Sequence, residues 1–278
     1  LKEHITDISS DDSDGTYIVK TENSSFKTKK LVIATGGMSY PKTGSDGSLY
    51  PLIEKLGIQM IPARPALVPI YTHSYGYRNL SGISFKAVLV RLLENNREIA
   101  AQTGDILLTH RAFSGPAILD ISRYADKGHK LEINYIYPVT GQRAADMIKA
   151  DFQGNSRELH TYISRIFKIP DAFAVKLIEN AGICPYMKTS CTEGDEITKI
   201  AEALTCHRYA VSGTGSFSEA MVTAGGVSLD EVNLRNMESK KHSNLFFIGE
   251  VLDIDGDTGG FNLQFAYSSA MAAVKNKK

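Results

Sequence analysis

The feature that most constrains the fold lies near the C-terminus, where a short apolar run leads into an acidic, glycine-rich loop. Residues 245–249 form the apolar run, which is typical of a strand buried on both faces of a parallel sheet. From Asn262 onward Ala, Leu, Met, Gln and Phe dominate without Pro or Gly, which predicts a helix. A strand, a glycine loop and a helix present backbone amides at the helix N-terminus, where a phosphate or an electron-rich ring edge can bind.

Two features of the loop favour a ligand. Gly259 and Gly260 have no Cβ, so a flat ligand can approach the backbone closely. Asp253 can accept hydrogen bonds from a polyol. The alternative is a tight connection whose glycines serve turn geometry only, and this stretch alone does not decide between the two.

A second stretch, near the N-terminus, repeats the pattern. Residues 30–35 read as another buried strand, which runs into Gly36 and Gly37. Two strands from opposite ends of the chain that both end in glycine loops predict one sheet with one ligand at its carboxyl edge.

These residues resemble a known family. Residues 33–37 (Ile-Ala-Thr-Gly-Gly) are similar to the Ala-Thr-Gly segment of two-dinucleotide-binding-domain flavoproteins. The C-terminal stretch resembles their second FAD-contacting motif, in which Gly-Glu or Gly-Asp precedes a glycine loop and a helix. More narrowly, the chain resembles the HI0933-like flavoprotein family, also described as YhiN-like or aminoacetone-oxidase-like. Four blocks in the family's order carry the resemblance: residues 34–47, 109–119, 222–227 and 249–264.

The resemblance implies FAD as the cofactor. The implied cofactor-binding residues are Ala34, Thr35, Gly36, Gly249, Glu250, Asp253, Gly259, Gly260, Phe261, Asn262 and Leu263. Family members also carry a βαβ unit with a G-x-G-x-x-G fingerprint that binds the ADP half of FAD, and this sequence has no such unit. We therefore expect a fragment that lacks its N-terminal βαβ unit and that binds FAD weakly or not at all by itself.

The charge balance bears on partners. The 278-residue chain has 31 Lys and Arg and 31 Asp and Glu, so its net charge is zero. A neutral chain gives no electrostatic argument for nucleic acid or a membrane surface, and no apolar run approaches the roughly 20 residues that span a bilayer. Three cysteines without a C-x-x-C pair indicate reduced thiols in a cytoplasmic protein. We expect a small-molecule substrate, no nucleic acid, no membrane and no metal site, while the oligomeric state stays open.

The expected fold class is α/β, with an incomplete FAD/NAD(P)-binding Rossmann-like domain formed by residues 1–64 and 229–278. Strand patterns predict an inserted antiparallel β domain over residues 65–140 and 206–228. Apolar residues at helical spacing predict a small helical subdomain over residues 141–205, inserted into the β domain.

His110 is the candidate catalytic residue. It follows a predicted strand, where a histidine can act as an acid or base or polarise a substrate carbonyl. The alternative is a histidine bonded to backbone at a strand end. The resemblance places its block close to the family's active-site cavity.

The expected function is that of an FAD-dependent oxidoreductase acting on an unassigned small molecule. The resemblance allows either amine oxidation or reduction of an unsaturated ligand. Two alternatives stay open, a non-catalytic binding module derived from a flavoprotein and an RNA-modifying flavoprotein. The neutral charge balance argues against the second.

Overall fold

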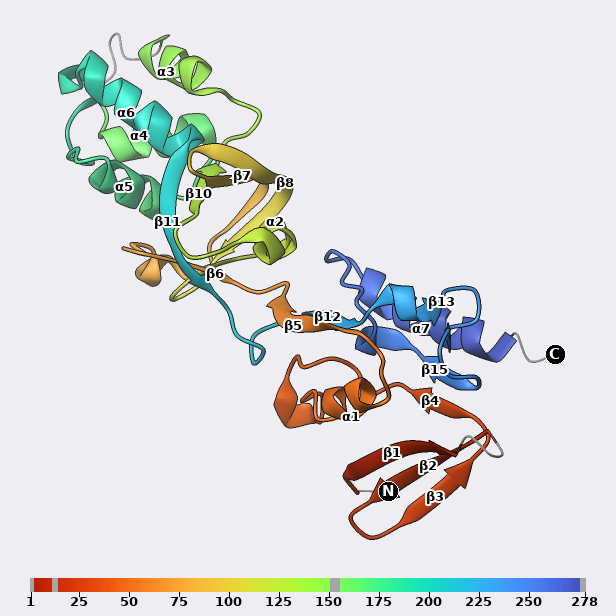
Figure 1. Ribbon diagram of the computed structural model, residues 1–278. Coiled ribbons are helices and arrows are strands. Elements are labelled where there is room, and N and C mark those ends of the chain that lie inside the picture. Colours follow the sequence, from red (N-terminus) through yellow and green to blue (C-terminus); the bar gives the residue numbers. More distant parts are fainter. Residues whose placement is uncertain (1–2, 12–14, 151–155, 276–278) are drawn as a thin grey trace. The chain divides into compact units, whose positions relative to one another are not determined.

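The chain divides into two compact units (Figure 1). The computed structural model describes residues 3–11, 15–150 and 156–275. The first unit contains Leu1–Leu67 and Gly215–Lys278, and the second contains Val68–Thr214. The outer limits of the predicted Rossmann-like domain, residues 1–2 and 276–278, and residues 151–155 of the predicted helical insert lie outside the described residues. The division into three domains stays a prediction.

The described strands of the first unit belong to three sheets. One is an antiparallel meander, one is an antiparallel pair, and one is a mixed sheet of four strands. In order of pairing, the meander contains β1 (Ile5–Asp11), β2 (Thr16–Thr21) and β3 (Ser25–Thr28), and the antiparallel pair contains β12 (Val222–Val227) and β5 (Met60–Ala66). The mixed sheet contains β13 (Val232–Asn233), β14 (Glu238–Ser239), β15 (Leu245–Phe247) and β4 (Leu31–Ile33).

The two strands that precede the glycine segments lie in one sheet, as the sequence predicted, and they pair directly in parallel. Leu31 of β4 lies opposite Leu245 of β15, and Ile33 lies opposite Phe247. Ile33 and Phe247 are buried, but Val32 is 49% exposed, so β4 is not the fully buried strand that the sequence predicted. The reason is that β15 covers one edge of β4, and the described residues leave its other edge and one face open.

The α-helices described in the first unit have proline or glycine at their starts. They are α1 (Tyr50–Lys55) and α7 (Phe261–Lys275), with short 3-10 turns η1 (Pro41–Thr43), η5 (Leu229–Glu231) and η6 (Gly249–Val251). Gly259 and Gly260 have φ values of +114° and +92°, which glycine adopts at little cost, and the Gln264 amide donates to the Gly260 carbonyl at 3.0 Å. Helix α7 therefore starts directly after the glycine pair, one residue earlier than predicted.

The second unit contains a closed antiparallel barrel. Its strands, in order around the barrel, are β10 (Lys130–Asn134), β11 (His207–Thr214), β6 (Ile70–Thr72), β9 (Phe113–Ser114), β8 (Arg97–Leu108) and β7 (Ser84–Glu94). Asn95 and Asn96 join β7 to β8 with φ values of 49° and 64°, the left-handed conformation that tight hairpin turns require.

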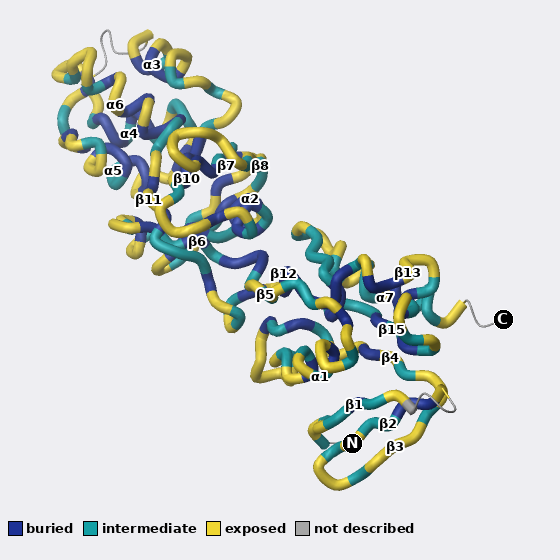
Figure 2. The backbone as a smooth tube through the Cα atoms, in the orientation of Figure 1, coloured by how far each residue is buried: buried dark blue, intermediate teal, exposed yellow. Residues whose placement is uncertain are grey.

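Helices pack against this barrel (Figure 1). They are α2 (Pro116–Ile121), α3 (Gly141–Ala150), α4 (Leu159–Phe167), α5 (Asp171–Asn180) and α6 (Gly194–Thr205), with 3-10 turns η2 (Arg78–Leu80), η3 (Ser122–Tyr124) and η4 (Thr189–Cys191). Buried segments follow the barrel strands and the inward faces of these helices (Figure 2). The core contains a tyrosine network in which the Tyr209 hydroxyl lies 2.7 Å from that of Tyr77 and 2.6 Å from that of Tyr135.

Two ionic groups connect elements of the second unit. The buried Glu132 carboxylate accepts from Arg91 at 3.0 Å and from Arg208 at 2.7 Å, which joins β10 to both neighbouring strands. The His160 ring lies 2.8 Å from an Asp171 oxygen and 3.0 Å from a Glu158 oxygen. Burial alone lowers the pKa of His160, but the two carboxylates outweigh it, and the pKa is raised overall.

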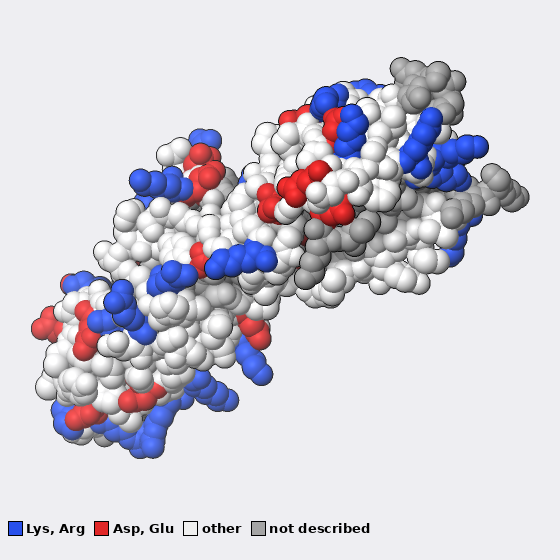
Figure 3. Space-filling model, turned by 90° about the horizontal axis from the view of Figure 1, so that it is seen from below, with Lys and Arg blue, Asp and Glu red and all other residues white. Residues whose placement is uncertain are grey.

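Charges of both signs are interspersed on the face drawn in Figure 3. Among the residues described, none of the helices combines the length and the apolarity needed to cross a bilayer.

Candidate functional site

The candidate site lies at the carboxyl edge of the β4–β15 pair. The Ile248 amide donates to the Ile33 carbonyl at 3.1 Å, so the segments that follow the two strands lie side by side. One segment begins with Ala34, Thr35 and Gly36, and the other begins with Gly249. The fold thus brings Ala34, Thr35 and Gly36 close to Gly249 and Glu250, and Ala34 and Thr35 are exposed there.

Glu250 fastens three chain segments together, an arrangement that we call the Glu250 clasp. Its carboxylate accepts from the backbone amide of Thr223 at 2.6 Å and from that of Gly37. The fully buried Thr223 hydroxyl in turn accepts from the amides of Met38 at 2.7 Å and Ser39 at 3.1 Å. The clasp consists of Gly37, Met38, Ser39, Thr223 and Glu250, and it fixes the loop after β4 against β12.

The surroundings of the clasp raise the pKa values of two side chains. Burial raises the pKa of Glu250, and the amides of Thr223 and Gly37 offset only part of that rise. Burial, with a smaller contribution from the Glu250 carboxylate, raises the pKa of Tyr50 to about 12. The Tyr50 hydroxyl oxygen is buried and has no hydrogen-bond partner among the described residues. Buried hydroxyls are nearly always satisfied, so Tyr50 stands out in the described part of the chain as an unsatisfied polar group near Glu250.

Asp253 and the glycine pair of β12 have structural contacts in this unit. Asp253 accepts from the Gly225 amide at 3.0 Å through one carboxylate oxygen. A Cβ at Gly225 would lie 2.4 Å from the Pro62 carbonyl oxygen, and one at Gly226 would lie 2.4 Å from the Val251 carbonyl oxygen. The pairing of β12 with β5 shifts register between Ala224 and Gly226, so these glycines allow a β-bulge and close backbone packing.

The conformation of the glycine loop before α7 is stabilised by a side chain at the start of the helix. The Asn262 side chain accepts from the Gly256 amide at 2.8 Å and donates to the Gly256 carbonyl at 2.9 Å. A Cβ at Gly260 would meet nothing within 4 Å, and Phe261 and Leu263 are exposed. The first amides of α7 have no acceptor within the helix and carry its positive end. The open glycine and the helix amides fit an electron-rich group of a polar cofactor such as FAD.

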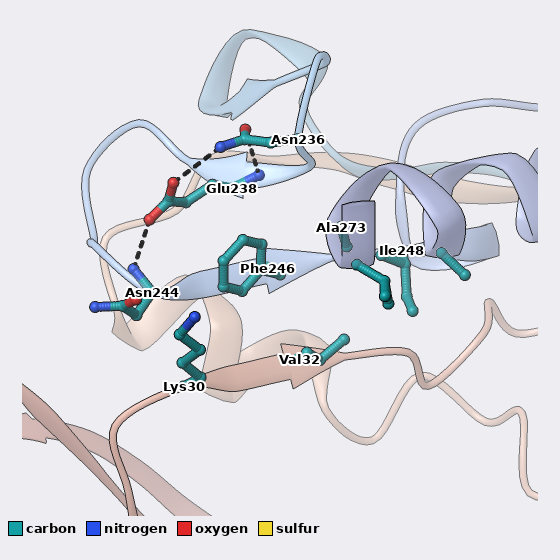
Figure 4. A pocket seen from close by; sticks show the side chains of 10 residues that line it. Lys30, Val32, Asn236, Glu238, Asn244, Phe246, Ile248 and Ala273 are labelled. Atoms are coloured by element: carbon teal, nitrogen blue, oxygen red, sulfur yellow. Dashed lines mark hydrogen bonds between the residues drawn. The ribbon is translucent and has the colours of Figure 1, made fainter. Parts of the chain in front are cut away.

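A second hollow lies beside the same strands but away from this edge (Figure 4). Its volume is about 370 Å³, and Val32, Phe246, Ile248 and Val274 form its apolar wall. Glu238, which accepts from the Asn244 amide at 2.7 Å, lies with Lys30 at the amino ends of the strands. We call this hollow the β4 groove.

His110 lies in the second unit, at an exposed turn. Thr109 closes that turn, because its hydroxyl donates to the Ala112 carbonyl at 2.8 Å and accepts from the Ala112 amide at 3.0 Å. The neighbouring Arg111 guanidinium lies 5.6 Å from the centre of the Tyr71 ring. Thr109 thus supplies side-chain bonds to the backbone of this turn. The catalytic role of His110 stays a prediction.

Thr223 and Tyr50 belong to this site although the sequence analysis missed them. The signal for Thr223 was a polar residue inside an otherwise apolar strand, two residues before a glycine pair. Tyr50 gave no comparable signal, because a tyrosine in a short helix is usually a packing residue.

Comparison with known families identifies the fold. Residues 1–276 match the HI0933-like protein Rossmann domain. The chain belongs to the HI0933-like family. The predicted resemblance and the Rossmann-like, mixed α/β class are thereby confirmed, whereas the inserted domain and the missing βαβ unit stay predictions.

Curated relatives of this HI0933-like chain are enzymes. It is 32% identical over 251 residues to the ribosomal RNA dihydrouridine synthase of Escherichia coli, and 31% identical over 261 residues to that of Haemophilus influenzae. It is 25% identical over 268 residues to the 3-dehydro-bile acid delta(4,6)-reductase of Clostridium scindens. The matches cover 89%, 93% and 92% of the chain, but only 60%, 62% and 64% of the respective relatives.

The expectation of no nucleic-acid partner is wrong. Two HI0933-like relatives above 30% identity are named for an activity on ribosomal RNA. The physical reason for the error is that a net charge of zero says nothing about individual contacts. RNA is often recognised by stacking of unpaired bases together with a few phosphate contacts, and neither requires a basic chain.

Proposed function

We propose that the protein containing this chain is an FAD-dependent reductase that converts uridine to dihydrouridine in ribosomal RNA. Two relatives at 31–32% identity carry that activity in their name, and both match about nine-tenths of the chain. The proposal therefore replaces the small-molecule substrate expected from the sequence.

Chemistry supports reduction over amine oxidation, the two reactions that the family resemblance left open. Dihydrouridine differs from uridine by two hydrogens across the C5–C6 bond, which is conjugated to a carbonyl. A delta(4,6)-reductase of a 3-dehydro-bile acid is also named for carbon–carbon double bonds near a ketone. Both reactions add a hydride to an electron-poor carbon and a proton to its neighbour.

The observation that carries the cofactor assignment is the Glu250 clasp beside the open glycine loop. The clasp fixes the loop after β4, so that Ala34, Thr35 and Gly36 keep one conformation at the edge of the sheet. The amides at the start of α7 offer donors and positive potential to an electron-rich ring edge. FAD, once reduced by an external two-electron donor, would supply the hydride that no side chain can provide.

His110 is our candidate for the proton donor. Reduction of a conjugated double bond requires a proton on the carbon next to the carbonyl, and a histidine is suited to deliver one near neutral pH. In the full-length protein, His110→Gln should lower the rate at saturating RNA and leave the FAD content unchanged. An unchanged rate would remove His110 from the mechanism.

The test is to express the full-length gene product in a bacterial strain without ribosomal RNA dihydrouridine. Nucleosides from digested ribosomal RNA are then quantified by mass spectrometry, and the visible spectrum of the purified protein reports its flavin. Dihydrouridine in the RNA and flavin bands in the spectrum are expected. Absence of dihydrouridine, with flavin bound and an unsaturated steroid ketone reduced instead, would favour the second candidate, a bile-acid-type reductase.

A further inference from the structure

A cavity of about 500 Å³ lies in the second unit, at the rim of the barrel. The start of β7, the segment after β10 and the end of α4 form most of its lining. Its volume falls within the roughly 300–1,000 Å³ range of small-ligand sites. We call it the rim pocket and define it by Lys86, Ile136, Tyr137, Val139, Phe167 and Lys168.

The rim pocket is partly open, and its mixed lining includes several apolar side chains beside polar groups. Ile136, Val139 and Phe167 pack against the barrel core but are only partly buried, and Tyr137 is 44% exposed. An accessible aromatic ring beside aliphatic side chains is a surface on which a nucleobase can stack. Stacking of this kind tolerates any base, because every base has a π-face.

Two cations flank these walls. Lys86 comes from β7 and Lys168 follows α4, and both side chains are exposed. Neither lysine forms an ion pair with any residue that the structure describes, and no Asp or Glu is among the residues that line the pocket. Both positive charges are therefore available to anionic ligand groups.

The combination favours one kind of ligand. An unpaired nucleotide within a strand carries a flat base and has a phosphate on each side of its sugar. An aromatic ring beside aliphatic side chains, with two lysines on separate elements, matches that arrangement. An amphipathic carboxylate such as a bile acid has a single anionic group, so it would leave one lysine unused.

We propose that the rim pocket binds one unpaired nucleotide of the RNA substrate, with its base against Tyr137 and its phosphates near Lys86 and Lys168. This inference rests on the proposed function, which supplies the RNA. It adds a binding position in the second unit, separate from the glycine segments of the first unit.

The experiment measures binding of a fluorescein-labelled uridine dodecamer to the 278-residue chain by fluorescence anisotropy at several salt concentrations. The pocket variant is Lys86→Glu/Lys168→Glu. Its control is Lys127→Glu/Lys199→Glu, which changes the net charge equally at two exposed lysines outside the pocket. A second pair compares Tyr137→Ala with Tyr124→Ala, another exposed tyrosine of the same unit.

The pocket variant should bind the dodecamer at least tenfold more weakly at low salt, and the control should change less than twofold. Loss of two phosphate contacts should also reduce the slope of log affinity against log salt by about 1.4, since each contact to a single strand contributes about 0.7. Tyr137→Ala should weaken binding about 5- to 150-fold, the range for loss of one base–aromatic stack. Tyr124→Ala should have no such effect.

Several results would overturn the inference. Equal losses in the pocket and control variants would indicate unspecific electrostatic attraction. No binding of the dodecamer by the chain would remove the pocket as an RNA site, because the chain contains the whole pocket. Binding of cholate without binding of RNA would assign the pocket to an amphipathic carboxylate.

The proposed function can be judged separately from the pocket. The same pocket variant is introduced into the full-length gene product, and dihydrouridine in ribosomal RNA is quantified. Undiminished dihydrouridine with the variant would refute nucleotide binding in the rim pocket and leave the proposed function intact. Absence of dihydrouridine with the unaltered protein would refute the proposed function. The anisotropy measurement would still show whether the rim pocket binds RNA.

Discussion

Replacing Gly37 by alanine tests whether the Glu250 clasp depends on close packing. A Cβ at this position would lie 2.4 Å from Thr223 Oγ1 and 2.6 Å from Thr223 Cβ. Gly37 is not among the residues with positive φ, so its backbone can accommodate alanine. The cost of Gly37→Ala therefore comes from the collision with Thr223, which is fully buried.

The expected loss can be estimated from two contributions. Overpacking a buried site costs about 1–3 kcal/mol. Displacement of Thr223 also weakens the two hydrogen bonds that its hydroxyl accepts from the loop after β4, at roughly 0.5–1.5 kcal/mol each. Together Gly37→Ala should lower the free energy of unfolding by about 2–6 kcal/mol, a large part of the 5–15 kcal/mol typical of a domain.

A double-mutant cycle isolates the collision. In a Thr223→Gly background the Cβ and the hydroxyl are absent, so Gly37→Ala should cost less than about 1 kcal/mol. Urea unfolding followed by circular dichroism gives the four free energies. As a control, Gly194→Ala adds a Cβ that meets nothing within 4 Å in α6, and it should be neutral or stabilising by up to about 1 kcal/mol. An equal cost for Gly37→Ala in both backgrounds would refute the packing argument.

Three further predictions concern ionisable groups. The pKa of Glu250 is raised, so its carboxyl group stabilises the fold at low pH, and this stability is lost as the pH rises through the folded-state pKa. Glu250→Gln should abolish this pH dependence above pH 4.5, which urea unfolding at a series of pH values measures. The pKa of His160 is also raised, so its contribution is fully present below pH 6.5 and disappears at higher pH, and His160→Gln should destabilise at pH 6 but hardly at pH 9. Glu132→Gln should cost about 1–2 kcal/mol, because its arginine partners are partly exposed and screened, and the difference should shrink in concentrated salt.

The glycine segments and their helix could be predicted because local chemistry determines them. An apolar run, a glycine pair and an alanine-rich stretch each restrict the backbone within a few residues, and the pairing of β4 with β15 followed from that pattern. The turn at Asn95 and Asn96 was predictable for the same reason. The helical spacing in residues 141–205 likewise predicted α3 to α6.

Contacts between distant segments could not be predicted from local patterns. Strand β5 contains Pro62 and Pro65 and crosses the domain boundary that we predicted between residues 64 and 65. It pairs with β12 in a two-stranded sheet, whose edges tolerate proline. Thr223 meets Met38 and Ser39 across more than 180 residues of chain. Only the folded structure shows that these amides need an acceptor at that point.

Because no described strand pairs with one edge of β4, hydrogen exchange at a single backbone amide can report whether another strand pairs there. In parallel pairing, alternate residues face the partner strand, so the amide of Val32 points to the edge that no described strand covers. Its hydrogen should exchange with deuterated solvent almost as fast as in an unstructured peptide, although its neighbours in the strand are protected. Slowing of this single exchange rate would reveal a strand added beside the β4 groove, whichever molecule supplies it.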